Sequence, residues 1–130
     1  MAVSFSDKNL TVNGRTTELA WPILAAVEHG AKTFVLLDPD AYLTDPQYKA
    51  LRANGAPAIR NLIALGDNGA ILWEGELPQA ADYFYKITSV DPLIAYSCSS
   101  YSCEINADSG KITRKVFVKI MDSRRSDERR

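Results

Sequence analysis

The chain has 130 residues, which fits one ordinary domain with a single hydrophobic core. Its apolar share of 46% and charged share of 24% are typical of globular proteins, and a net charge of −1 gives no overall field that attracts nucleic acid. Since no apolar run approaches the roughly 20 residues of a membrane span and no secretory signal is present, we expect a cytoplasmic protein with neither membrane nor nucleic-acid partners.

The first element that we expect is a β-hairpin in residues 8–19. Its sequence, KNLTVNGRTTEL, places Asn13 and Gly14 between two short segments of strand character. Asn-Gly is the strongest two-residue hairpin signal, because both central positions of a type I′ turn need a positive φ.

A short helix is expected next, over residues 21–29. The segment AWPILAAVEHG spaces its apolar residues as on one face of a helix rather than in alternation. Pro22 suits the first helical turn, and Gly30 suits the C-terminal cap. This is the main helix that the sequence predicts.

The run TFVLL at 33–37 predicts a buried strand that ends at Asp38-Pro39-Asp40. Residues 41–58 carry the weakest pattern and predict a mobile surface loop. A turn or two of helix fits within residues 46–53, whose side chains tolerate that conformation.

From residue 60 onward, the pattern predicts one strand after another. Residues 122–130 are all polar and predict a disordered tail beyond one domain of residues 1–121. The fold that we expect is α+β, with a single, mostly antiparallel, twisted sheet of roughly six to eight strands packed on one main helix. The expected strands of this half are 60–65, 70–76, 83–87, 93–98, 101–106 and 111–120.

One turn occurs twice, as DNG at 67–69 and as DSG at 108–110. The two copies are 41 residues apart (67 to 108), and each lies between two segments of strand character. A period near 40 with one such turn per unit is typical of propeller blades. A closed propeller needs at least about four blades, roughly 160 residues, so the chain is too short for one. Repetition favours a structural role for the turn.

These turns resemble the A-x-D-x-x-G-x-x-x-W unit of pyrroloquinoline-quinone-type propeller repeats. The first copy has the same residue types in the same order, Ala64, Asp67, Gly69 and Trp73, spaced as A-x-x-D-x-G-x-x-x-W, and the second keeps the aspartate and the glycine without the tryptophan. The unit is a packing motif in those propellers, so the resemblance implies no cofactor. For Trp73 we expect packing near Trp21 and a buried partner for the indole N–H.

The order of elements also resembles a class of small, mostly uncharacterised bacterial proteins. In these, a hairpin, a helix and an apolar strand ending in Leu-Asp precede a segment such as NLIAL-DxxG-xIxW, which stands here at residues 61–73. Several proteins of this style look like immunity proteins that neutralise a toxin. The resemblance therefore implies a protein partner.

Cys98 and Cys103 are the only cysteines. Two thiols without a nearby histidine do not make a zinc site, and their spacing differs from the CxxC of redox proteins. Flanking a tight hairpin loop, they could face each other within disulfide range. The alternative is two small thiols kept reduced in the cytosol.

An acidic segment, with Asp38, Asp40 and Asp45, follows the buried strand. Together with His29, the carboxylates of Asp38 and Asp40 suggest a small metal-dependent hydrolase as the alternative function. Asp and Pro are also ordinary turn formers, whose carboxylates cap backbone N–H groups. No nucleophile elbow and no phosphate-binding glycine loop is present, so no catalytic residue, metal ligand or cofactor is assigned.

Aromatic residues gather between 83 and 101. If Phe84 points inward on its strand, its two tyrosine neighbours point outward, where they either anchor a partner or form cross-strand pairs. Acidic residues around them favour a basic partner surface. We expect a non-enzymatic protein-binding module, most concretely an immunity-type inhibitor, and a homodimer stays open. The expected contact residues are Tyr83, Tyr85, Tyr96, Tyr101, Glu74 and Glu76.

Overall fold

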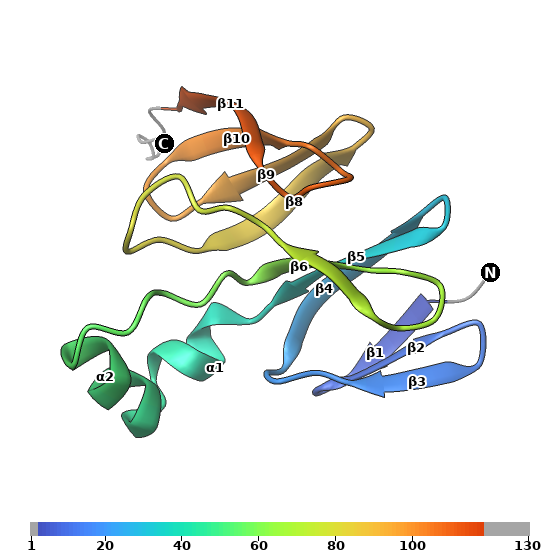
Figure 1. The fold of residues 1–130 in the computed structure, drawn as a ribbon, viewed down its shortest axis with the longest axis horizontal. Helices are drawn as coiled ribbons and strands as arrows, with labels where there is room; N and C mark the ends of the chain where they lie inside the picture. The colour runs from blue at the N-terminus through green and yellow to red at the C-terminus, as the bar shows by residue number, and fades with distance from the viewer. Residues whose placement is uncertain (1–2, 119–130) are drawn as a thin grey trace, which may run out of the picture.

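The computed structural model describes residues 3–118, and the expected tail at 122–130 lies outside that part. Within it, eleven strands form three antiparallel sheets, and two short helices stand beside them (Figure 1). The fold is mostly β. The expected single sheet on one main helix is therefore wrong, because the strands separate into three layers that cover one another's faces.

The N-terminal sheet consists of β1 (Val3–Ser6), β2 (Asn9–Val12) and β3 (Arg15–Glu18). Its β2–β3 hairpin confirms the one expected in residues 8–19. Asn13 and Gly14 form the turn with φ values of 52° and 82°, as two left-handed positions require.

The middle sheet has the order β4-β5-β6-β7. It consists of β4 (Ile23–His29), β5 (Lys32–Leu37), β6 (Leu62–Leu65) and β7 (Ile71–Glu74). The expected strands at 33–37, 60–65 and 70–76 are confirmed in β5, β6 and β7. Every residue of β6 is buried, so this sheet has protein on both of its faces.

Alternation along β5 divides its side chains between two separate cores. Phe34 and Leu36 belong to the core shared with the C-terminal strands, whereas Val35 and Leu37 belong to the core shared with the N-terminal sheet. Successive residues of a strand point to opposite faces, so a strand covered on both sides is apolar throughout. That is the physical reason for the uninterrupted TFVLL run.

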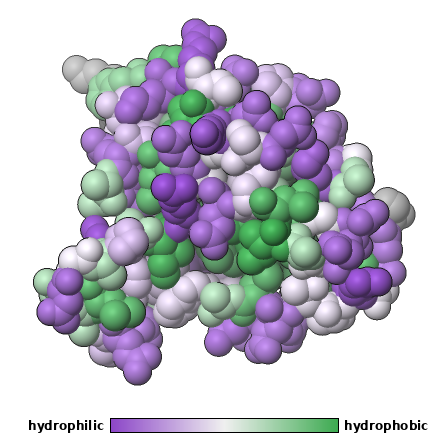
Figure 2. Space-filling view, viewed as in Figure 1, coloured by the Kyte–Doolittle hydropathy of each residue, from purple (hydrophilic) through white to green (hydrophobic). Residues whose placement is uncertain are grey.

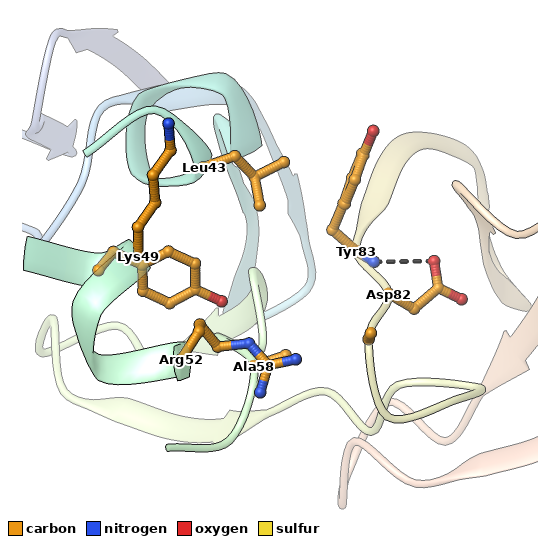
Figure 3. A pocket seen from close by; sticks show the side chains of 8 residues that line it. Leu43, Lys49, Arg52, Ala58, Asp82 and Tyr83 are labelled. Atoms are coloured by element: carbon orange, nitrogen blue, oxygen red, sulfur yellow. Dashed lines mark hydrogen bonds between the residues drawn. The ribbon is translucent and has the colours of Figure 1, made fainter. Parts of the chain in front are cut away.

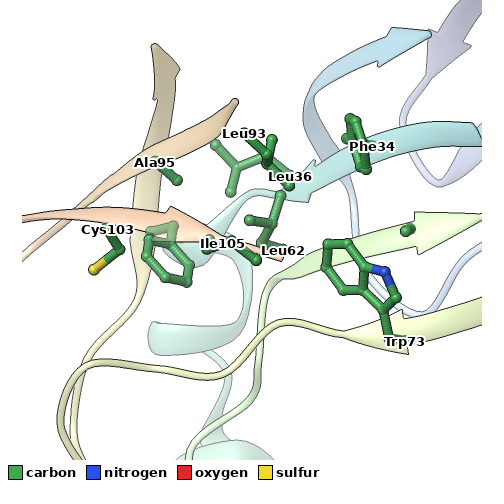
Figure 4. Close-up of a cluster of buried hydrophobic side chains, with 10 residues drawn as sticks. Phe34, Leu36, Leu62, Trp73, Leu93, Ala95, Cys103 and Ile105 are labelled. Carbon is green, nitrogen blue, oxygen red and sulfur yellow. The ribbon is translucent and has the colours of Figure 1, made fainter. Parts of the chain in front are cut away.

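The C-terminal sheet has the order β11-β10-β9-β8. It consists of β8 (Phe84–Val90), β9 (Leu93–Ser97), β10 (Tyr101–Ile105) and β11 (Ile112–Phe117), all close to the expected strands. Figure 4 shows the core between this sheet and the middle sheet. Its buried side chains are Phe34, Leu36, Leu62, Ala64 and Trp73 from one side and Phe84, Leu93, Ala95, Cys103 and Ile105 from the other.

The helix expected over 21–29 is wrong, because this segment is strand β4. A register shift between Ile23 and Ala25 in its pairing with β5 interrupts the alternation of side chains, and the interruption imitates helical spacing. Gly30 has a φ of 63° and sits in the two-residue turn between β4 and β5 rather than at a helix end.

Two short helices follow β5 in the chain, α1 (Pro39–Leu43) and α2 (Pro46–Ala53). The helix expected within 46–53 is confirmed as α2, and α1 is an addition to the expected loop. Asp38 and Asp45 are the N-cap residues, and each carboxylate accepts an N–H of the following helix at 3.0 Å.

The repeated turns occupy equivalent places, since 67–69 joins β6 to β7 and 108–110 joins β10 to β11. Both are the last turn of a four-stranded antiparallel sheet. Gly69 and Gly110 have φ values of 84° and 77°, so each glycine takes the left-handed position of its turn. The repeated turn in the sequence therefore corresponds to a turn at the same place in two different sheets.

Trp73 packs in the core between the middle and C-terminal sheets, and its ring centroid lies 6.0 Å from that of Phe34. The expected position near Trp21 is wrong, because Trp21 packs on the opposite face of the middle sheet. The expected partner for the indole is confirmed, since Nε1 donates to the Ala107 carbonyl at 2.9 Å.

Candidate functional site

Three of the four tyrosines of the expected contact surface, Tyr83, Tyr85 and Tyr96, lie near one another along the pairing of β8 with β9. Phe84 is buried and Tyr85 exposed, as the alternation predicts. Tyr85 lines a shallow hollow beside β4, whereas Tyr83 faces α2. Tyr83 and Tyr85 nevertheless both lie near Cys98, and Tyr85 also lies near Tyr96.

The other two tyrosines lie on opposite faces of the C-terminal sheet. Tyr96 shares the outer face with Val116 and lines a hollow there. Tyr101 packs against Phe117, with ring centroids 5.8 Å apart and an interplanar angle of 73°. The Nζ of Lys115 lies 4.8 Å from the centre of the Tyr101 ring, so this tyrosine stiffens the pair β10–β11.

Glu76 connects the middle sheet to the C-terminal sheet. Its N–H donates to the Gly110 carbonyl at 2.8 Å, and its Oε1 accepts the N–H of Ile112 at 2.9 Å. Glu74, by contrast, is exposed on β7 and lines a groove. The two predicted glutamates therefore have different surroundings, and Glu74 alone faces a cavity.

We call this cavity the β7 groove. It has a volume of about 610 Å³ and lies between the end of β3, the segment 57–60 and the strands β6 and β7. Trp21, Leu37 and Ile63 contribute apolar surface to it. Its charged residues are Glu18, Arg60 and Glu74.

β7 is an edge strand of the middle sheet, so one row of its backbone groups faces no further strand of that sheet. The N–H of Gly75 donates to the Leu62 carbonyl at 2.7 Å. Because the backbone N–H groups of successive residues point to opposite sides of a strand, this bond fixes which residues of β7 direct their N–H toward β6. The N–H of the preceding residue, Glu74, consequently points away from β6. The strand thus offers backbone hydrogen bonds beside the groove.

Apolar side chains add to this edge. Ile71 of β7 is 51% exposed and lines the groove, and its neighbour Leu72 is also half-exposed. Figure 2 shows hydrophobic side chains near the middle of the view, where Figure 1 draws β6 and β7. A strand edge with exposed apolar side chains is a ready template for pairing with another chain.

The acidic segment after β5 has a structural explanation. Asp38 and Asp45 cap the two helices, and His29 is exposed at the β4–β5 turn. Among residues 3–118, no group of three or more histidine, cysteine, aspartate or glutamate side chains is arranged to hold a metal ion. The carboxylates of Asp38 and Asp45 therefore serve the backbone, and Asp40 lies in the first turn of α1.

The two cysteines are free, Cys98 at the surface and Cys103 in the core. Cys103 pairs with Ala95 across the β9–β10 ladder, so Cys98 is not its cross-strand neighbour. The alternative of two separate thiols describes this arrangement.

Sequence reasoning missed most of the β7 groove. Trp21 and Arg60 belong to segments that are distant in the chain, and only the packing of three layers brings them together. The sequence around Ile71 has an ordinary strand pattern, which does not indicate that this side chain is half-exposed. One signal was present, since Glu74 was among the expected contact residues.

Within residues 3–118, neither helix has the length and apolar character that crossing a bilayer requires. A family model described as "Domain of unknown function (DUF7957)" matches residues 1–117. No curated protein and no solved structure matches the chain.

Proposed function

The chain belongs to the family of the domain of unknown function DUF7957, and we propose that it is a non-enzymatic binding protein whose β7 groove holds an extended, basic segment of a partner protein. The observation that carries this proposal is the open edge of β7 alongside a groove of about 610 Å³. An extended peptide that adds a strand to a sheet edge gains affinity from backbone hydrogen bonds and specificity from pockets for its side chains.

The backbone part of the interaction is short. Past Glu74, the chain turns toward the C-terminal sheet, where Glu76 hydrogen-bonds to Gly110 and Ile112. The open edge is therefore limited to Ile71–Glu74. Four residues pair with a peptide strand of similar length, which suits a loop or a terminus of the partner.

The charges around the groove favour a basic partner. Glu18 and Glu74 outnumber Arg60, which leaves one net negative charge on the lining. Apolar surface from Trp21 and Ile71 suits aliphatic side chains that alternate with the basic ones. A segment in which lysine alternates with valine has the required chemistry.

A toxin-neutralising protein is the most concrete function of this type. An immunity-type inhibitor needs a surface that covers a segment of its target and no chemistry of its own. Support for this reading comes from the absence of an arranged metal-binding group in residues 3–118 and from the use of the acidic segment as helix caps. The partner in this reading presents a basic strand or loop.

The experiment uses two labelled peptides of about nine residues, one alternating lysine and valine and one alternating glutamate and valine. Fluorescence polarisation measures binding, and amide NMR of the full chain locates it. The lysine peptide should bind and should slow hydrogen exchange at the Glu74 amide. Glu74→Lys should weaken this binding at least tenfold, whereas Glu28→Lys on the opposite edge strand β4 should leave it unchanged.

A second pair of variants tests the apolar part. Ile71→Thr keeps a β-branched side chain but reduces the apolar surface of the groove, and Val116→Thr, which replaces one methyl group by a hydroxyl, is the control on the edge strand β11. Only the first should weaken peptide binding. Binding that maps to β11, or that Ile71→Thr and Glu74→Lys leave unchanged, would overturn the proposal.

A further inference from the structure

A second cavity lies between helix α2 and the segment 81–83 that leads into β8. It has a volume of about 310 Å³, and we call it the α2 pocket. Figure 3 shows Lys49 and Arg52 on its helical side and Asp82 and Tyr83 across from them. This volume lies at the lower end of the range for small-molecule sites.

The helical side of the pocket carries two cations. Lys49 and Arg52 are three residues apart on α2 and therefore start from one face of the helix, and their charged ends extend toward opposite ends of the pocket (Figure 3). Among residues 3–118, the single ion pair is the one between Lys32 and Asp108, so neither cation of the pocket has a carboxylate within 4.0 Å. Both can receive a negative group from outside.

Arg52 is already held in place. Its Nη1 donates to the Ala56 carbonyl just after the helix. A guanidinium group has five N–H donors, so most of them remain for a second acceptor. A planar cation fixed in this way is suited to a carboxylate or a phosphate group.

The facing carboxylate does not compete for these cations. Asp82 is 5% exposed, and its Oδ1 accepts the N–H of Tyr83 at 2.8 Å and that of Ser99 at 3.2 Å. Its Oδ2 accepts the hydroxyl of Ser99. These three bonds direct the negative charge of Asp82 toward the backbone and Ser99.

A buried hydroxyl without a partner lies beside the pocket. Tyr42 is 1% exposed, and its hydroxyl has no hydrogen-bond partner within residues 3–118. Its ring meets that of Tyr48 edge-on, with centroids 5.2 Å apart. Burial is the main cause that raises the pKa of Tyr42, and the charges of Tyr48, Tyr83, Asp38 and Asp82 raise it further.

Tyr48 lines the pocket, so Tyr42, whose ring contacts that of Tyr48, packs behind part of the pocket wall. A buried donor without an acceptor is unfavourable, and a ligand that supplies an acceptor removes this penalty. The orphaned hydroxyl is thus an observation independent of the two cations.

We propose that the α2 pocket binds a small organic anion, with its carboxylate or phosphate group on Arg52 and its apolar body against Leu43 and Tyr48, and that the flexible side chain of Lys49 turns toward the bound anion. The site is distinct from the β7 groove, with which it shares only Ala58. The ligand has about the size of a substituted benzene ring, because the pocket accommodates little more.

The test uses phenyl phosphate and benzoate as probes and benzyl alcohol as the neutral control. Amide NMR of the full chain should show shifts at α2 and at residues 81–83 with at least one of the two anions. Benzyl alcohol should bind at least tenfold more weakly. Failure of both anions at millimolar concentration, or equal binding of the alcohol, would overturn the proposal.

Variants locate the anion. Lys49→Gln and Arg52→Gln should each weaken binding at least fivefold, and Arg114→Gln on the outer face of the C-terminal sheet should leave it unchanged. Lys49 is exposed, and its side chain forms none of the hydrogen bonds or ion pairs found within residues 3–118, so its variant should keep the fold even if the Arg52 variant does not. Unchanged affinity in Lys49→Gln would contradict the proposed role of the two cations.

The hydroxyl of Tyr42 has its own test. Tyr42→Phe keeps the ring and its contact with Tyr48 while removing the orphaned hydroxyl. Binding of the better anion should fall several-fold in this variant, and the unliganded protein should become no less stable. Equal affinity in Tyr42→Phe would exclude the hydroxyl from the site.

Discussion

The side-chain amide of Asn61 holds the backbone of Phe84 at both of its polar groups. Its Nδ2 donates to the Phe84 carbonyl at 2.7 Å, and its Oδ1 accepts the Phe84 N–H at 2.9 Å. The same Nδ2 donates to the Leu37 carbonyl at 3.0 Å. Asn61 is fully buried, and these bonds join the middle sheet to the first strand of the C-terminal sheet.

Replacing Asn61 by alanine should destabilise the protein strongly. Three buried backbone groups would lose their partners, and each unsatisfied group costs about 1–3 kcal/mol. We expect the free energy of unfolding to fall by about 3 kcal/mol or more, as measured by urea denaturation. Asn54→Ala is the control, because the Asn54 side chain makes one exposed bond to the Ala50 carbonyl. A similar loss in both variants would contradict this role of Asn61.

Replacing Gly110 by alanine should be much worse than replacing Gly14. Both glycines have a positive φ, 77° and 82°, so alanine is strained at either site by about 1 kcal/mol. A Cβ at Gly110 would lie 2.6 Å from Cε3 of Trp73, whereas one at Gly14 would meet nothing within 4 Å. Overpacking should add about 1–3 kcal/mol at Gly110 alone.

Thermal unfolding followed by tryptophan fluorescence measures the difference in stability between the two variants. The indole of Trp73, which the new methyl group would contact, is itself one of the fluorescent groups. Gly14→Ala is the control, because it introduces the backbone strain of a positive φ without a contact to Trp73. Equal melting temperatures for the two variants would show that Trp73 yields to the new methyl group.

The two thiols should differ in reactivity. Cys98 is exposed, whereas Cys103 is buried, and burial raises the pKa of Cys103 to about 11. The thiolate is the reactive species, so at pH 8 iodoacetamide should modify the native protein once, at Cys98. Mass spectrometry after proteolysis identifies the site, and unfolding in urea should expose the second thiol. Rapid double modification of the native chain would contradict the buried position of Cys103.

Stability should fall between about pH 10 and pH 12. A hydrogen bond with the Cys98 thiol and then burial raise the pKa of Tyr83 from 10.0 to about 12. The neutral phenol is therefore favoured by the fold, and its contribution is complete below pH 10 and lost as the pH rises through 12.

Urea denaturation at pH 9 and at pH 11.5 measures this loss. Tyr83→Phe cannot ionise, so the loss between the two values should be smaller in that variant. Identical losses in the variant and the parent protein would assign the alkaline transition to other groups, such as Tyr42 or Cys103.

Most strands could be predicted from the sequence because their signals are local. Alternation and Asn-Gly or Asp-x-Gly turns indicate where a hairpin begins and ends. The same local signals failed at β4 (Ile23–His29), where one register shift disturbs the alternation. The number of sheets could not be predicted. The sequence of β5 indicates two apolar faces, but it does not indicate whether one layer or two layers of structure cover those faces.

The candidate site was predictable only in part. Glu74 was found because an acidic residue near an aromatic strand suggests a contact surface. Its neighbours in the groove, Trp21 and Arg60, come from segments that meet only after the sheets pack. Of the tyrosines that cluster in the sequence, Tyr83, Tyr85 and Tyr96 stay near one another. Alternation and strand order send Tyr101 to the opposite face of the C-terminal sheet from Tyr96.

The double coverage of the middle sheet has a consequence for synthesis on the ribosome. β5 and β6 leave the ribosome before the strands that cover Phe34 and Leu62, and the last of the covering residues, Ile105, follows Leu65 by 40 positions (65 to 105). At about 5–20 residues per second, this interval lasts roughly two to eight seconds. During that time the nascent chain presents an uncovered apolar surface, which is where a holding chaperone would bind it.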